Sequence, residues 1–102
     1  MKIVAVTACP TGVAHTFIAA KALEKASKKL GYEIKVERQG ALGIQNRLTE
    51  EDINTCDVVI YAVDQKVVED HRFKCKTIYT VSVTEPIKDG VGVIKGALKL
   101  IE

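Results

Sequence analysis

The chain has 102 residues, of which 47% are hydrophobic and 27% charged, with a formal net charge of +2. This length predicts one domain, and the small charge without an aromatic and basic stripe argues against nucleic-acid binding. The three cysteines form no Cys-x-x-Cys pair and have no ligand spacing with the two histidines. We therefore expect no metal site and a reducing compartment. Residues 3–20 carry no charge, but Pro10, Gly12 and polar side chains interrupt them, so we expect no membrane insertion.

The first half of the chain alternates between strand and helix patterns. Residues 2–8 are nearly all apolar and predict a buried strand. Residues 13–30 place apolar side chains at helical spacing, and Gly31 is the type of residue that ends a helix. In residues 32–38 apolar and charged residues alternate, which predicts an edge or half-exposed strand. A glycine-containing loop over 39–47 follows.

A second helical segment and a second buried strand come next. Thr49, with Asp52 three residues later, resembles a capping box and predicts a short helix over about 50–55. Residues 57–63 form a nearly continuous apolar run, which predicts a central strand. Residues 66–71 are expected to form another short helix.

The last part of the chain predicts one more strand and one more helix. Residues 77–83 alternate less regularly and suit the other edge of the sheet. Pro86 then opens a helix that reaches Leu100, although three glycines within it lower its helical propensity.

This order of elements predicts an α/β fold of three layers, with a four-stranded parallel sheet between two layers of helices. The two fully apolar strands belong in the centre, which gives the strand order 2-1-3-4. Right-handed crossovers put the first and last helices on one face and the middle two on the other. The direction of winding reverses between strands one and three, and ligands bind beyond the carboxyl ends of strands at such a point. Cys9 follows the first strand at this place.

The loop after the first strand predicts a phosphate-binding site with Cys9 as the nucleophile. Positions 9–16 read Cys-Pro-Thr-Gly-Val-Ala-His-Thr, and a helix N-terminus favours both an anion and a thiolate. Pro10 has no N–H, so the donors to a phosphoryl group are expected from Thr11, Gly12, Val13, Ala14, His15 and Thr16. The plainer alternative is a buried cysteine that packs as a small hydrophobic residue.

The sequence also suggests roles for His15 and Asp64. A phosphoryl dianion on Cys9 would stabilise the imidazolium form of His15, so His15 could respond to the charge state of Cys9. Asp64, at the end of the third strand, could orient the loop or cap the helix expected at 66–71. The residues leave both roles open for Asp64.

The loop also has the residue count of a cysteine phosphatase loop, C-x-x-x-x-x-R-[ST], with His15 in the place of arginine. An arginine there would hold phosphate oxygens with a bidentate fork, and histidine lacks that fork. The pattern therefore favours a phosphoryl carrier. A small cysteine phosphatase or arsenate-reductase-like enzyme stays as the alternative, supported by the Glu85-Pro86 pair, and a non-enzymatic binding domain is a third possibility.

The run CPTGVAHTFIAAKAL, residues 9–23, closely resembles the phosphorylation loop and first helix of one known family. That family is the enzyme IIB component of the bacterial sugar phosphotransferase system, fructose branch. The segment QGALG with Asn46, residues 48–53 followed by 57–64, and the Arg72-Phe73 pair resemble later parts of the family in the same order. The resemblance covers essentially the whole chain, so residues 1–102 are expected to be a single IIB domain.

The resemblance implies that Cys9 takes a phosphoryl group from a phosphohistidine on a IIA protein. Cys9 would then pass it to a sugar, typically fructose, bound by the membrane transporter IIC. This activity is that of a phosphotransferase with a phosphocysteine intermediate and no cofactor. It implies a cytoplasmic protein that lies against the inner face of the membrane through IIC. The residues leave open whether the sugar is fructose, mannitol or another hexose.

Overall fold

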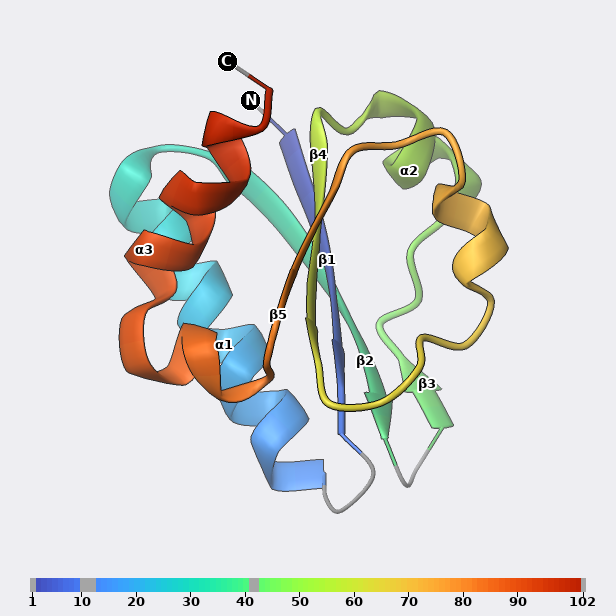
Figure 1. Cartoon of the computed structure of the whole chain (residues 1–102), viewed down its shortest axis with the longest axis horizontal. Coiled ribbons are helices and arrows are strands. Elements are labelled where there is room, and N and C mark those ends of the chain that lie inside the picture. Colours follow the sequence, from blue (N-terminus) through green and yellow to red (C-terminus); the bar gives the residue numbers. More distant parts are fainter. Residues whose placement is uncertain (1, 10–12, 41–42, 102) are drawn as a thin grey trace.

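The computed structural model describes residues 2–9, 13–40 and 43–101, with only the backbone of Val13. These residues form a five-stranded sheet in the order β3-β2-β1-β4-β5, covered by helices on both faces (Figure 1). The strands are β1 (Lys2–Ala8), β2 (Glu33–Gly40), β3 (Gly43–Gln45), β4 (Val58–Val63) and β5 (Ile78–Val81). β1 and β4 are buried on both faces, as their continuous apolar sequences predict.

The predicted four-stranded, wholly parallel sheet is wrong in one respect. The order 2-1-3-4 matches the parallel strands β2-β1-β4-β5, but β3 adds a fifth strand antiparallel to β2. Gly43 has φ +88°, a conformation that glycine adopts without strain, and it pairs with Gly40 as the chain returns along β2. β2 is therefore an inner strand, although its alternating sequence predicts an edge.

The helices divide between the two faces as the crossover rule predicts. α1 (Val13–Leu30) and α3 (Thr84–Lys99) cover one face, and α2 (Glu50–Thr55) and the 3-10 helix η1 (Asp70–Phe73) cover the other (Figure 1). A hydrophobic core lies on each face of the sheet, and successive side chains of β1 point into the two cores alternately. Ile3 and Ala5 point toward α1, and Val4 and Val6 point toward η1. No helix in the described ranges is long and apolar enough to cross a membrane.

The helix expected at 66–71 is absent, and the chain instead forms η1 a few residues later. Glu69 precedes η1 with φ 58° and ψ 39°, a left-handed conformation that separates 66–68 from the helical turn. Val67 fills the core under this segment and Phe73 is fully buried beside Tyr61, with ring centroids 5.6 Å apart. Core packing by these two side chains therefore decides where the turn forms.

The C-terminal helix starts at Thr84, two residues before Pro86, and it contains a kink. Asp89 has φ −156° and ψ 81°, and its carboxylate accepts a hydrogen bond from the Gly92 N–H at 2.9 Å. Asp89 thereby caps the second half of α3. The next residue, Gly90, lies so close to α1 that an added Cβ would be 2.9 Å from the carbonyl oxygen of Ala22. The kink and the glycine together allow α3 to pack on α1.

We predict that Gly90→Ala lowers the free energy of unfolding by about 1–3 kcal/mol, because the new methyl group meets backbone of α1. Chemical denaturation measures the change. Lys95→Ala, at an exposed position of the same helix, is the matched control and should stay within about 0.5 kcal/mol of the parent. Equal stability of the two variants would contradict the close packing at Gly90.

Candidate functional site

Cys9 follows the last residue of β1 and is held from both neighbouring strands. Its N–H donates to the carbonyl of Gln39 in β2 at 3.4 Å, and the carbonyl of Ala8 accepts from the Asp64 N–H after β4 at 2.8 Å. The Cys9 side chain is 3% exposed and packs with Ala19 of α1 and Val83 before α3. The thiol therefore lies at the carboxyl end of the central strand, on the α1 side of the sheet.

The first turn of α1 approaches the thiol. His15 Nδ1 lies 3.9 Å from Cys9 Sγ, while the Thr7 hydroxyl donates to the carbonyl of Thr16 at 3.2 Å and ties α1 to β1. The first turn contains no acidic residue, so α1 itself supplies no carboxylate there to offset the partial positive charge of the helix end. A helix N-terminus without an acidic residue is a favourable place for an anion.

The structure describes only some of the predicted phosphate-binding residues. Thr11 and Gly12 lie outside the described residues, and the side chain of Val13 does too. α1 begins at Val13, so Ala14 and His15 belong to its first turn, whose N–H groups have no intrahelical acceptors. Both of these side chains are exposed, whereas Thr16 is buried. The described part of the loop has the helix-start geometry that the sequence predicts.

Asp64 contacts the connection between β5 and α3. Its Oδ1 accepts hydrogen bonds from the Ser82 hydroxyl at 2.7 Å and from the Val83 N–H at 3.2 Å. The expected role as a cap of a helix at 66–71 is therefore wrong, since that helix does not form. Val83, whose N–H Asp64 accepts, packs in the same cluster as Cys9.

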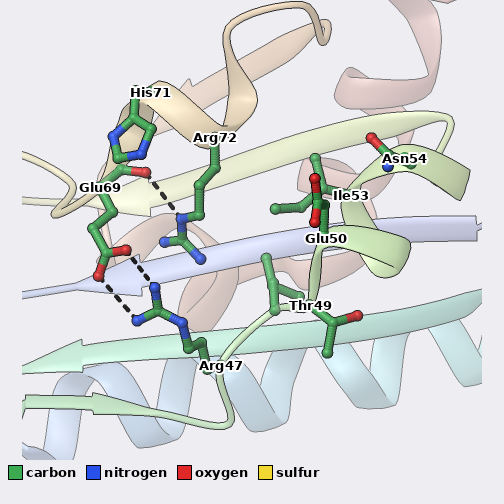
Figure 2. Close-up of a pocket in the computed structure, with 9 residues that line it drawn as sticks. Arg47, Thr49, Glu50, Ile53, Asn54, Glu69, His71 and Arg72 are labelled. Carbon is green, nitrogen blue, oxygen red and sulfur yellow. Dashed lines mark hydrogen bonds and ion pairs between the residues drawn. The ribbon is translucent and has the colours of Figure 1, made fainter.

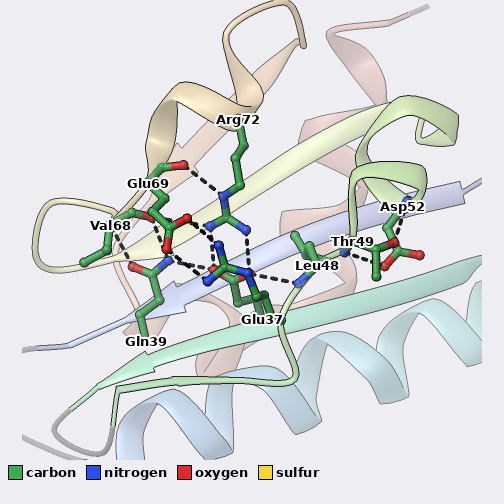
Figure 3. Close-up of polar contacts among 9 residues, drawn as sticks. Glu37, Gln39, Leu48, Thr49, Asp52, Val68, Glu69 and Arg72 are labelled. Carbon is green, nitrogen blue, oxygen red and sulfur yellow. Dashed lines mark hydrogen bonds and ion pairs between the residues drawn. The ribbon is translucent and has the colours of Figure 1, made fainter.

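A cluster of buried polar residues lies on the other face of the sheet (Figure 3). The sequence patterns do not predict it. Glu37 is fully buried, and both of its carboxylate oxygens accept from the Arg72 guanidinium, at 2.9 and 2.8 Å. The Leu48 N–H and the Gln39 carboxamide also donate to Glu37, at 2.9 and 2.7 Å. Burial by itself raises the pKa of Glu37, but the hydrogen bonds from Arg72, Leu48 and Gln39 outweigh burial and lower that pKa.

A groove of about 640 Å³ lies beside this cluster, between α2 and η1 (Figure 2). Two arginines line it, and both are already paired, Arg47 with Glu69 and Arg72 with Glu37. Its other lining residues are Leu48, Thr49, Glu50, Ile53, Asn54, Glu69 and His71. The sulfur of Cys9 belongs to the opposite face, so this groove is separate from the site that the sequence predicts.

We predict that Glu37→Gln lowers the free energy of unfolding at pH 7 by about 3 kcal/mol, because Arg72 loses its charged partner in a buried position. The folded-state pKa of Glu37 lies below its ordinary value of 4.5, so the ion pair stabilises the fold above that pH. The stability difference between parent and variant should therefore shrink as the pH falls below about 4.5. Urea denaturation across a pH series measures it.

The control for this variant is Glu33→Gln, an exposed carboxylate on the same strand. We expect it to change stability at pH 7 by no more than about 0.5 kcal/mol. A difference for Glu37→Gln that stays constant down to pH 3 would contradict the ion pair as its cause.

The comparisons with known proteins identify the family of the chain. The family model described as "PTS system, Lactose/Cellobiose specific IIB subunit" matches residues 4–96. The "PTS system fructose-like EIIB component 1" of Escherichia coli (strain K12) is 44% identical over 100 residues, spanning 98% of this chain and 93% of that protein. Component 2 of the same strain is 51% identical over 87 residues, spanning 85% of this chain and 82% of that protein.

A solved structure of the same family has the same fold as this chain. It is a domain of the fructose-specific IIABC component of Borrelia burgdorferi, 53% identical, with a TM-score of 0.90. The match covers 96% of this chain and 93% of that domain. With a family match over most of its length and relatives above 40% identity, this chain belongs to the IIB family of the sugar phosphotransferase system, whose members carry phosphoryl groups.

Proposed function

We propose that Cys9 carries the phosphoryl group as a phosphocysteine, taking it from a phosphohistidine of a IIA protein and passing it to a sugar held by membrane IIC. The observation that carries the proposal is the position of Cys9 between the end of β1 and the start of α1, with His15 Nδ1 3.9 Å from its sulfur. This is where an α/β sheet binds ligands and where a helix end favours an anion.

The transfer consists of two displacements at phosphorus. The Cys9 thiolate attacks the phosphoryl group, a P–S bond forms, and the P–N bond to the donor histidine breaks. A sugar hydroxyl oxygen then attacks the same phosphorus, the P–S bond breaks, and the sulfur leaves as thiolate. First-turn N–H groups stabilise charge on the phosphoryl oxygens in both steps. His15, in its protonated form, adds a positive charge beside the phosphocysteine.

The burial of Cys9 suits a carrier better than a hydrolase. At 3% exposure Cys9 leaves little room for water at its sulfur, whereas a phosphatase must admit and activate water. The family assignment likewise does not favour the phosphatase or arsenate-reductase-like alternative.

Exposed apolar side chains at this end of the sheet support docking of both partners. Phe17 and Ile18 stand on the first turns of α1, Val68 follows β4, and Ile87 lies near the start of α3, each 38–51% exposed. These segments all follow carboxyl ends of strands, the end at which Cys9 lies (Figure 1). Partners that approach Cys9 at this end of the sheet would meet these side chains.

The names of the relatives support fructose as the sugar, since both curated relatives are named fructose-like and the Borrelia protein is fructose-specific. On this proposal residues 1–102 form one IIB domain. The domain works in the cytoplasm, at the inner face of the membrane, through its contact with IIC.

We predict that Cys9→Ser abolishes phosphorylation of this chain by a phosphorylated IIA protein of the fructose branch. Phosphorus NMR should show a thiophosphate signal in the parent protein and none in the variant. Cys75→Ser, which replaces an exposed cysteine away from the site, is the control and should keep the signal. A signal that survives in Cys9→Ser would refute the proposal, and rapid Cys9-dependent hydrolysis of an aryl phosphate would favour a phosphatase.

A further inference from the structure

The sulfur of Cys9 is enclosed, but the imidazole beside it is not. Cys9 is 3% exposed, whereas His15, on the first turn of α1, is an exposed side chain whose Nδ1 lies 3.9 Å from the sulfur. A thiol must lose its proton before it attacks phosphorus, because the thiolate is the nucleophile. Since the sulfur is enclosed, the ring of His15 is a route by which that proton can reach water.

The distance between the two side chains is set by the elements that carry them. Cys9 directly follows β1, and its N–H donates to the carbonyl of Gln39 in β2 at 3.4 Å. The buried hydroxyl of Thr7 in β1 donates to the carbonyl of Thr16, the residue after His15, at 3.2 Å. β1 and the first turn of α1 are therefore tied together, which keeps the imidazole within reach of the sulfur.

The contact suits the transfer of a proton from sulfur to nitrogen. A neutral imidazole that carries its proton on Nε2 presents Nδ1 as an acceptor, and a thiol is a donor. After the transfer, the imidazolium offsets the burial that by itself disfavours a thiolate. The start of α1 favours the thiolate and disfavours the imidazolium, but at 3.9 Å the attraction between the two charges is larger than the effect of an exposed helix end.

Charged side chains of the neighbouring elements make other contacts. Asp64, after β4, accepts hydrogen bonds from the connection between β5 and α3. Lys21 of α1 and Arg38 of β2 lie over the same aromatic ring of α1, and Glu85 is exposed in the first turn of α3. His15 is thus the ionisable side chain whose nitrogen the structure brings to the sulfur.

We propose that Cys9 gives its thiol proton to Nδ1 of His15, so that the two side chains form a thiolate–imidazolium pair before the phosphoryl donor arrives. The S–H bond breaks, an N–H bond forms, and the sulfur keeps the electron pair with which it then attacks phosphorus. His15 is therefore the catalytic base that prepares the first displacement. This inference rests on the function proposed above.

The first measurement follows the imidazole by NMR of protein with isotope-labelled histidine, in the absence of any donor. The pH at which the His15 ring loses its proton should be at least about one unit higher in the parent than in Cys9→Ser, because serine supplies no negative charge to hold the imidazolium. His71 is the internal control, since it is exposed on η1 at the opposite face of the sheet. Its titration should be the same in both proteins.

The second measurement follows the thiolate by its ultraviolet absorbance in a Cys75→Ser background, which removes the exposed cysteine. The thiolate should appear at least about one pH unit higher in His15→Asn than in the parent, because asparagine cannot take up the proton. Burial raises the pKa of the remaining Cys56 thiol, so Cys56 ionises later in the titration. His71→Asn is the matched control and should leave the thiolate titration unchanged. Coupling between two sites is reciprocal, so the shifts in the two measurements should be similar in size.

The rate of phosphorylation by a phosphorylated IIA protein of the fructose branch tests the catalytic consequence. His15→Asn should lower the initial rate at pH 7 about tenfold, because an ordinary thiol is only a few per cent thiolate there. Raising the pH to about 9 should restore most of this loss, since the thiol then ionises without a base. A loss that persists at the higher pH would contradict the role of His15 as a base.

Two further results would overturn the pair. An unchanged His15 titration in Cys9→Ser would show that no thiolate holds the imidazolium. A thiolate that forms as easily in His15→Asn as in the parent would assign its stabilisation to the start of α1 alone. Both titrations are made without a donor, so they judge the pair independently of the proposed function, which fails if the parent protein gains no phosphoryl group on Cys9.

Discussion

The hydrogen bonds at the carboxyl end of β1 are the constraint on which the site depends. β1 is the central strand, and its end is fixed by Gln39 on one side and by Asp64 on the other. On the proposed function Cys9 takes a phosphoryl group from a protein histidine and passes it to a sugar. In-line displacement depends on the alignment of the reacting atoms, so the sulfur needs a defined position. Placing Cys9 one residue beyond a strand that is hydrogen-bonded on both edges supplies that position without a metal or a disulfide among the described residues.

The two faces of the sheet contribute differently to this arrangement. The α1 face holds the sulfur against Ala19 and Val83 and supplies the helix end that favours an anion. The opposite face contains the charged pair of Glu37 and Arg72, which would be expensive to bury without its further hydrogen bonds. Leu48 and Gln39 complete the hydrogen bonding of the carboxylate. The cluster therefore fixes the connection between β2, η1 and the segment after β4.

Several elements follow from local sequence and agree with the structure. The bounds of α1 and α2 are those predicted, because an apolar stripe and a capping box specify them within a few residues. The Thr49 hydroxyl accepts from the Asp52 N–H at 3.0 Å, and the Asp52 carboxylate accepts from the Thr49 N–H at 2.9 Å. The place of Cys9 is also a local property, since it needs only an apolar strand followed by a helix start. The order of the parallel strands follows from which runs are apolar throughout.

Long-range contacts decide the rest. Alternation along β2 marks Glu37 as a solvent-facing residue, and only the folding of η1 onto that face brings Arg72, 35 positions away, to neutralise it. In the same way, β3 forms only by pairing with β2. The carboxylate of Asp64 accepts a hydrogen bond from Ser82, 18 positions later, because β4 and β5 are paired. The sequence by itself therefore determined α1, α2, the parallel core and the position of Cys9 at the start of α1, because neighbouring residues specify those. Tertiary structure alone decided which polar side chains are buried together, because burial of a charge depends on a partner that local patterns do not contain.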